Sequence, residues 1–402
     1  MRRLFSFTIS VLMTTFLQAQ TSDPTKQDYQ NLADKLLSSG NPLTIGGYGE
    51  VHYHQPFSSD TRMNGELDVH RMVILFGYQF SERTRFVTEL EFEHVSEVYV
   101  EQAFLQHKLN RAVNLRAGLL LIPMGIVNEY HEPTTFNGVE RPLIDNKIAP
   151  TTWREVGAGF SGTIRSVALK YQAYVVNGFN GYDGTARLNG KNGLRSGRQK
   201  GASSYISSPN FTGKLEYYGI RGLNIGLSGY FGDTQSTLYD GIEKDDDAAL
   251  AKADSSVVGI SMIGLDARYN LKGLQLRGQL YRINLSNTSQ YNHFTADDEG
   301  SLNDLGSRMT GYYVEAGYNV FRHLEKTKTE LIPFVRLEGY DTHAEVSGEI
   351  TRKESYKNRV ITSGLTLRLA RGAVLKTDLQ MVKPDGADRY SKVFSMGVGV
   401  MF

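Results

Sequence analysis

Apolar and polar residues alternate along most of the chain, in segments of roughly ten residues, the length of a membrane-spanning strand. In the last segment every second residue is apolar, namely Phe394, Met396, Val398, Val400 and Phe402. A repeat of two residues places successive side chains on opposite faces of a β-strand. The pattern therefore predicts an all-β protein whose strands have one apolar and one polar face.

About sixteen segments follow this pattern, a strand number that leaves room for water inside a closed barrel. They lie near 43–54, 67–80, 85–96, 98–109, 114–122, 154–164, 166–177, 210–219, 222–232, 256–270, 273–285, 309–321, 329–340, 357–370, 373–383 and 393–402. A soluble β-sandwich would show the same alternation, so the connections between the segments decide between the two folds.

These connections alternate between long and short. The long ones are 55–66, 123–153, 178–209, 233–255, 286–308, 341–356 and 384–392. Those between them are almost all tight, as at 81–84 and 371–372, and one connection on the long-loop side, between the third and fourth strands, is also short. Outer-membrane barrels have long extracellular loops and short periplasmic turns. We therefore predict a transmembrane antiparallel β-barrel in the outer membrane of a Gram-negative bacterium.

The N-terminus supports an exported protein. Arg2 and Arg3 precede an apolar run at 4–17, and Ala19 is a small residue before polar Gln20, as in a secretory signal peptide. We expect a signal peptide at 1–19, a periplasmic segment at 20–42 and the barrel at 43–402. Leu17 departs from the usual small residue at its position, so the exact cleavage site stays open.

Composition excludes several functional classes. The chain has no cysteine, so it has no disulfide and no thiolate site. Its 44 basic and 43 acidic residues nearly cancel, which argues against a nucleic-acid-binding protein. We found no catalytic or phosphate-binding motif of the G-x-S-x-G, H-E-x-x-H or P-loop type, and we expect neither an enzyme nor a cofactor.

The third long connection, 123–153, is the most distinctive segment. It contains four of the ten prolines and the single tryptophan, Trp153, together with apolar Phe136, Leu143 and Ile144. Such a rigid loop with apolar anchors favours packing against the inner barrel wall over free exposure. We predict a constriction loop, with a structured external loop as the alternative. The candidate constriction residues are Glu129, His131, Glu132, Glu140, Arg141, Asp145 and Lys147.

Short motifs in and after this connection resemble a known family. The runs L-I-P-M-G at 121–125, H-E-P at 131–133, R-P at 141–142 and P-T-T-W-R-E-V-G at 150–157 are similar to the phosphate-selective porin O and P family and its Bacteroidetes-type relatives. The resemblance implies a sixteen-stranded barrel, commonly trimeric, whose third loop folds inward. It also implies a pore lined by arginines and a lysine cluster for anions.

The charges expected inside the barrel depart from that last feature. Assigning faces by alternation, we predict pore-lining residues of both signs: Arg71, Glu89, Glu91, Glu93, Arg116, Lys170, Arg277, Arg336 and Arg368. With the other inward residues the two signs balance, whereas an anion filter would show a one-sided ring of charge. The sequence therefore predicts weak ion selectivity. Glu89, Glu91 and Glu93 form an acidic row that either contributes to a transverse field or is paired across strands.

Two further motifs are weaker. The run 157–162 matches G-x-G-x-x-G, but a loop precedes it and its glycines lie within a predicted strand, so we expect Gly157, Gly159 and Ser161 to leave space for the inward loop. His52 and His54 share one face of the first strand, a spacing that suits a metal ion. No third ligand is identifiable in the sequence, so we expect ordinary polar histidines and no metal site.

The sequence therefore favours a water-filled porin for passive diffusion of small hydrophilic or charged solutes, with anions such as phosphate among the candidates. Phe402 closes the last alternating strand and resembles the signal read by the barrel-assembly machinery. Further expected partners are outer-membrane lipid and two more copies in a homotrimer. The main alternative is a non-conducting barrel that acts as an adhesin or binding protein through its long loops.

Overall fold

The computed structural model describes residues 31–38, 40–324 and 327–402. The expected signal peptide at 1–19, and the first part of the segment 20–42, lie outside the described residues. Among the described residues, no helix is long and apolar enough to cross a membrane.

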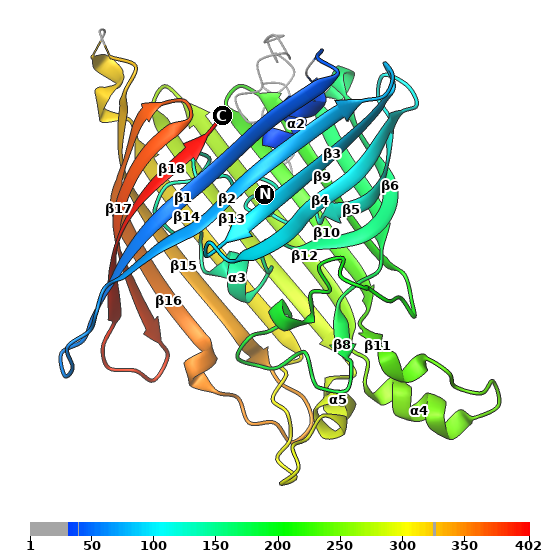
Figure 1. The fold of residues 1–402 in the computed structure, drawn as a ribbon. Helices are drawn as coiled ribbons and strands as arrows, with labels where there is room; N and C mark the ends of the chain where they lie inside the picture. The colour runs from blue at the N-terminus through cyan, green and yellow to red at the C-terminus, as the bar shows by residue number, and fades with distance from the viewer. Residues whose placement is uncertain (1–30, 39, 325–326) are drawn as a thin grey trace, which may run out of the picture.

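Within these residues, sixteen strands close into one antiparallel barrel (Figure 1). They are β1 (Leu43–Phe57), β2 (Glu66–Gln79), β3 (Thr84–Glu93), β4 (Glu97–Lys108), β5 (Asn114–Leu121), β6 (Arg154–Ile164), β7 (Leu169–Val176), β9 (Asn210–Ile220), β10 (Leu223–Asp233), β12 (Gly259–Leu271), β13 (Leu274–Ser286), β14 (Arg308–Tyr318), β15 (Glu330–Glu345), β16 (Lys357–Ala370), β17 (Ala373–Pro384) and β18 (Ser391–Met401). The first strand pairs with the last, which leaves no free edge. The predicted fold is confirmed, with strand ends shifted by a few residues.

Each strand separates lipid from lumen by its alternation. In β12, Leu265 points outward and is 49% exposed on the isolated chain, whereas the neighbouring Asp266 points inward and is buried. The outward residues form an apolar belt that would contact lipid, and the inward residues are mostly polar.

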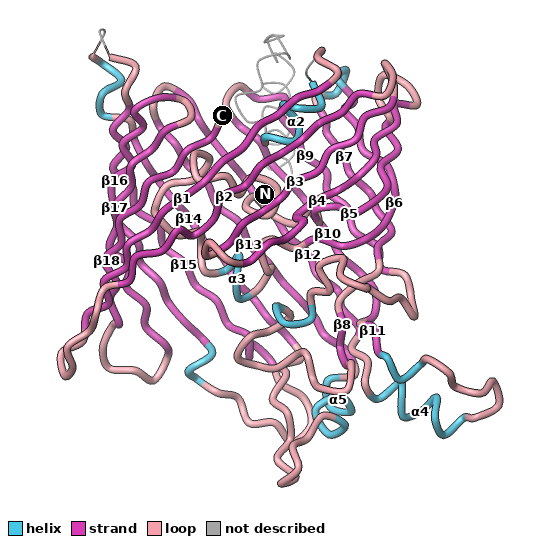
Figure 2. Tube along the Cα trace, viewed as in Figure 1, coloured by secondary structure: helices cyan, strands magenta, loops and turns pink. Residues whose placement is uncertain are grey.

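Loops differ sharply between the two rims (Figure 2). On the rim with long loops, the connections contain α4 (Asp247–Ser255), α5 (Thr288–Phe294) and a parallel pair of short strands, β8 (Asn180–Tyr182) and β11 (Gln235–Ser236). These elements were not predicted. On the other rim most strands are joined by a few residues, and the connection 319–329 is the longest. The long-loop rim is therefore extracellular and the short-turn rim periplasmic.

The barrel register shifts at several places, and two of these β-bulges, in β2 and β4, add side chains to the lumen. In β2, Arg71 pairs with Glu50 but Asp68 pairs with His52, so both His70 and Arg71 point inward. In β4, the register skips Glu101, and a bulge of this kind leaves the extra residue unpaired. Strict alternation from the sequence cannot place these extra inward residues.

Part of the N-terminal segment packs inside the periplasmic mouth. The helix α2 (Leu32–Ser38) places Leu32 and Leu36 against β1 and β2, where a methyl group on Gly46 would lie 3.1 Å from Leu32. Beneath the helix, the main-chain N–H of Leu32 donates to Glu132 in the third long loop (2.6 Å). The helix therefore supports that loop from the periplasmic side.

The glycines of β6 have a different role from the one we expected. A side chain on Gly157 would meet the Val175 carbonyl oxygen at 2.2 Å, and one on Gly159 would meet the Ala173 oxygen at 2.1 Å. Both atoms belong to the neighbouring strand β7. These glycines therefore allow β6 and β7 to approach closely, a role that the sequence did not suggest.

Candidate functional site

The third long loop, residues 122–153 (hereafter loop 3), lies inside the barrel and contains the short helix α3 (Ile144–Lys147; Figure 1). Most of its residues are buried. Its main-chain N–H groups donate to side chains on distant strands, from Ile126 to Gln279 on β13 (2.7 Å) and from Val139 to Asp378 on β17 (2.6 Å). Contacts with several sides of the wall confirm the predicted inward fold.

The anchors in loop 3 are apolar as well as polar. Phe136 and Ile144 are buried, while Leu143 is half-buried. Trp153, at the end of the loop, stacks on Phe179 with ring centroids 4.5 Å apart. The apolar residues singled out in the sequence therefore lie within the packed part of the loop.

Five basic residues of the wall hold loop 3 by its main chain. They donate to carbonyl oxygens as follows: Arg71 to His131 (2.6 Å), Lys214 to Gly125 (2.5 Å), Arg277 to Thr135 (2.9 Å), Arg336 to Asn137 (2.6 Å) and Glu140 (3.2 Å), and Arg368 to Thr134 (3.2 Å). Hydrogen bonds with a charged donor are stronger than neutral ones. Four of these cations were predicted to line the pore, and their hydrogen bonds bind the loop.

Carboxylates on the wall compensate these cations. The pairs are Arg71–Glu50 (2.6 Å), Lys214–Asp266 (3.4 Å), Arg277–Glu315 (3.2 Å), Arg336–Glu315 (2.8 Å) and Arg368–Glu330 (3.0 Å). A buried charge is costly unless it is paired and hydrogen-bonded. Each cation that holds the loop lies beside a carboxylate. The balance of inward charges predicted from the sequence therefore results from neighbouring pairs of opposite charge.

The acidic row on β3 forms a second anchor. Glu89 and the bulge residue Glu101 lie 3.6 Å and 3.3 Å from the His131 ring, and Tyr48 donates to both carboxylates. Glu91 lies 3.7 Å from Arg71, so this row is paired across strands. Glu93, at the extracellular end of β3, is half-buried.

The predicted constriction residues separate into two groups. Four are anchors: Glu129 accepts from Lys214 (2.9 Å), His131 and Glu132 make the contacts described above, and Asp145 accepts from Gln279 (2.5 Å) and Tyr281 (3.2 Å). The other three, Glu140, Arg141 and Lys147, are half-buried.

On the periplasmic side of loop 3 the lumen contains a cavity of about 330 Å³ beside α2. Its lining includes Glu129 and two of the predicted pore-lining cations, Arg116 and Lys170. Arg116 also donates to Gln106 (2.8 Å) and lies 3.9 Å from Asp34 of α2. The periplasmic half of the lumen is thus polar but partly filled by the N-terminal helix.

On the extracellular side of loop 3, cations gather near the carboxylate of Glu93. Arg141 and Lys147 of loop 3 meet the connection 177–209, and together they form the basic cluster: Arg141, Lys147, Lys191, Arg195, Arg198 and Lys200. Among the described residues, no ion pair within 4.0 Å involves any of these six.

Burial and, to a smaller extent, the neighbouring cations lower the pKa values in this cluster, while Glu93 opposes the shift at Arg195, Arg198 and Lys200. Burial, with Arg195 and Lys191 nearby, lowers the pKa of Lys147. Burial, with Arg195 and Arg154 nearby, lowers the pKa of Arg198 to about 9. Like charges disfavour the charged form, so an anion placed among them would be stabilised. Arg195 and Arg198 both donate to the Thr151 carbonyl oxygen, which fixes their position on the extracellular side of loop 3.

Sequence reasoning did not identify one further cluster. His52 and His54, treated as ordinary polar histidines, both contact Glu140 of loop 3. The alternation showed that the two histidines share a face, but no sequence signal placed residue 140 opposite them.

Comparison with known proteins places the chain among outer-membrane porins by fold. It superposes with a TM-score of 0.58 on OmpF of Salmonella typhi, at 14% identity, covering 90% of this chain and 98% of OmpF. The anion-selective porin from Comamonas acidovorans gives 0.56 at 14% identity, with 90% and 99% covered. The channel DcaP of Acinetobacter baumannii gives 0.56 at 9% identity, with 90% and 97% covered.

Sequence comparison is more limited. No family model matches the chain, so the resemblance to the phosphate-selective porin O and P family rests on its short motifs alone. An uncharacterized protein of Aquifex aeolicus (strain VF5) is 31% identical over 367 residues, which cover 89% of this chain and 79% of the relative. The chain therefore belongs to the same family as this Aquifex aeolicus protein, and it is an outer-membrane β-barrel with a porin-like channel fold.

Proposed function

We propose that the protein is a passive diffusion channel for small hydrophilic solutes, with a preference for small anions such as inorganic phosphate. The observation that carries this proposal is the basic cluster, in which six cations gather near the Glu93 carboxylate and make no ion pair within 4.0 Å among the described residues. The proposal revises the weak selectivity expected from the sequence, because the wall charges that balanced the count are paired with each other and with loop 3.

The position of the cluster determines its effect. Wall cations such as Arg336 and Arg71 are buried beside carboxylates, so they contribute little net field to the passage. The cluster lies where solutes entering from outside reach loop 3, and unpaired charge in a narrow, low-dielectric passage attracts the opposite ion strongly. The similar fold of an anion-selective porin is consistent with this preference.

The test is the reversal potential of single channels in a planar bilayer under a KCl gradient. The variant Lys147→Gln/Lys191→Gln removes two cluster charges whose side chains make no hydrogen bond or ion pair among the described residues. Lys244→Gln/Lys252→Gln, with the same charge change on the connection that contains α4, is the control. We expect wild type and control to favour chloride, and the cluster variant to favour it less. A non-selective or cation-selective wild type would refute the proposal.

The constriction role of loop 3 is tested separately. Shortening 129–147 should raise conductance while the barrel stays folded, and Arg141→Glu should shift selectivity toward cations. Unchanged conductance and reversal potential in both variants would show that ions do not pass this loop.

A second candidate function is a non-conducting barrel that binds partners through its extracellular loops. Loop 3 and α2 together fill much of the lumen, which favours this alternative. If folded protein, identified by its heat-modifiable mobility in gels, shows no channel activity in bilayers, the non-conducting function is supported.

We also propose that the protein is exported by a signal peptide at 1–19, inserted by the barrel-assembly machinery and assembled as a homotrimer. A neighbour by fold, OmpT of Vibrio cholerae, has been described in a trimer form. Cross-linking in outer membranes tests the trimer, and N-terminal sequencing of the mature protein tests the cleavage.

A further inference from the structure

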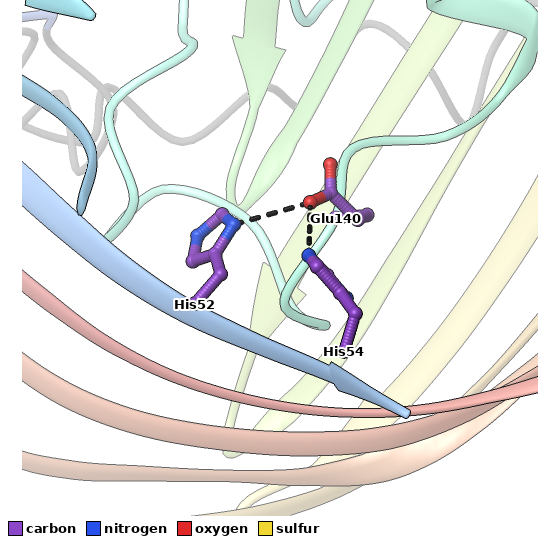
Figure 3. Close-up of side chains that lie close together, drawn as sticks. All are labelled: His52, His54 and Glu140. Atoms are coloured by element: carbon purple, nitrogen blue, oxygen red, sulfur yellow. Dashed lines mark hydrogen bonds and ion pairs between the residues drawn. The ribbon is translucent and has the colours of Figure 1, made fainter. Parts of the chain in front are cut away.

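Three side chains from two separate parts of the chain converge in the lumen (Figure 3). His52 and His54 project from the same face of β1, and Glu140 of loop 3 points between them. Glu140 Oε1 lies 3.1 Å from His52 Nδ1 and 3.2 Å from His54 Nε2. All three of these atoms lie within 4.8 Å of one another.

This geometry is close to that of a metal site. Ligand atoms around a tetrahedral ion with bonds near 2.1 Å are about 3.4 Å apart. The two oxygen–nitrogen distances are within a few tenths of an ångström of that value, so small side-chain rotations would complete the site. Two imidazoles and one carboxylate suit Zn²⁺ and similar transition metals, whereas Mg²⁺ and Ca²⁺ prefer oxygen ligands alone.

The second nitrogen of each ring has a partner on the wall. His52 Nε2 lies 3.3 Å from Glu50 Oε2, and His54 Nδ1 lies 2.9 Å from Ser395 Oγ. Glu50 is itself held by Arg71. Metal-bound histidines usually use their other nitrogen in this way, which fixes the ring orientation. On the loop side, Arg336 holds the Glu140 carbonyl oxygen, so the position of the third ligand is also fixed.

The cluster is open on one side. The His54 and Glu140 side chains are 24% and 41% exposed, while His52 is buried. A site with three protein ligands and one open position leaves room for a water molecule from the lumen. A second group of ligand-type residues, Asp68, His70 and His94, continues toward the extracellular turn, and its His70 ring stacks on His52 at 4.7 Å.

We propose that His52, His54 and Glu140 bind one divalent transition-metal ion inside the barrel, with lumen water as the fourth ligand. The bound ion cross-links loop 3 to β1. Binding requires only the folded barrel, so it does not depend on whether the pore conducts or which ions it prefers.

The experiment uses the full chain folded in detergent, treated with EDTA, freed of the chelator and titrated with Zn²⁺ by calorimetry. We expect one ion per chain. His54→Ala and Glu140→Gln should each weaken Zn²⁺ binding at least about tenfold. His107→Ala is the matched control, because His107 also lies on a barrel strand and its ring is hydrogen-bonded to Thr84 (2.9 Å), away from Glu140. Millimolar Mg²⁺ should not displace Zn²⁺.

Further measurements decide the outcome. Heat-modifiable mobility in gels shows whether each variant is folded. If His54→Ala does not fold, Glu140→Gln still tests the proposal. Co²⁺ in place of Zn²⁺ should give the visible absorption of a four-coordinate ion, and this absorption should be lost in Glu140→Gln. No stoichiometric Zn²⁺ binding, or equal affinity in wild type and both variants, would overturn the proposal. Loss of binding in His94→Ala but not in His54→Ala would place the ion in the outer group and would also overturn it.

Discussion

Replacing Arg336 by methionine should release loop 3 from the wall without opening the barrel. Arg336 is fully buried and donates to the carbonyl oxygens of Asn137 (2.6 Å) and Glu140 (3.2 Å). Its own strand pairing uses main-chain atoms, which the substitution leaves unchanged. Methionine matches the aliphatic part of the arginine side chain and supplies no donor in place of the guanidinium.

The magnitude follows from the two lost hydrogen bonds. A hydrogen bond with a charged partner contributes about 1.5–3 kcal/mol, so docking of 137–140 should weaken by roughly 3–6 kcal/mol. Glu315 would still be paired with Arg277 at 3.2 Å, which limits the free-energy cost of leaving the Glu315 carboxylate buried without Arg336. Because 1.4 kcal/mol is a factor of ten, local opening of this segment should become on the order of a hundredfold or more frequent.

Hydrogen–deuterium exchange of the peptide containing Val139 is the assay. Val139 donates its N–H to Asp378, so its exchange reports directly on docking. Lys170→Met removes another lumen cation, which lines the cavity beside α2. This variant is the control and should leave the exchange of the Val139 peptide unchanged. Equal protection of 137–141 in wild type and Arg336→Met would refute the anchoring role. If Arg336→Met fails to form a folded barrel, Arg336 is instead required for the stability of the barrel wall.

Three other predictions concern assembly, strand packing and the loops. Deleting Phe402 removes two main-chain hydrogen bonds to Gly47 (2.9 and 3.1 Å) and should lower the yield of folded, heat-modifiable barrel in the outer membrane; an unchanged yield would refute the role of this terminus. Gly159→Val should impair folding far more than Gly40→Val, because a side chain on Gly159 meets the β7 main chain and one on Gly40 meets nothing within 4 Å; similar refolding yields would contradict this. Burial raises the pKa of Asp304, but hydrogen bonds from Lys353, Gly190 and Tyr356 outweigh it and hold the pKa below its usual range. The loop contacts made by Asp304 should therefore be intact at neutral pH and weaken as pH falls below about 4, and Asp304→Asn should remove that part of the pH dependence of loop proteolysis; an identical pH profile in this variant would count against it.

The barrel could be predicted because its physical rule is local. Alternation and loop length are properties of neighbouring residues, and they located the strands and both rims. The inward loop was predicted from the prolines and apolar anchors within its own sequence. The lumen contacts could not be predicted, because they depend on bulges that shift the phase of β2 and β4. His70 reaches His52 only through the first bulge, and Glu101 reaches His131 only through the second.

The contacts of the inward-facing charged residues could not be predicted from the sequence either. Alternation placed Arg336 and Arg71 in the lumen, but it carries no information about which loop atoms they meet. Counting charges by face suggested a solvated, balanced pore. The pairing observed in the structure leaves a different set exposed to solutes, and most of that set comes from the connection 177–209, whose position no periodic pattern describes.

Many of the contacts between the wall and loop 3 are made to main-chain oxygens, and every amino acid supplies one. Five basic side chains recognise the path of the loop, and they place little demand on the side chains along that path. Substitution of Arg141 or Lys147, whose side chains are half-buried, therefore leaves these main-chain hydrogen bonds in place. The same separation would let a designer exchange the solute-facing residues of this barrel while keeping its scaffold, much as binding loops are exchanged on an antibody framework.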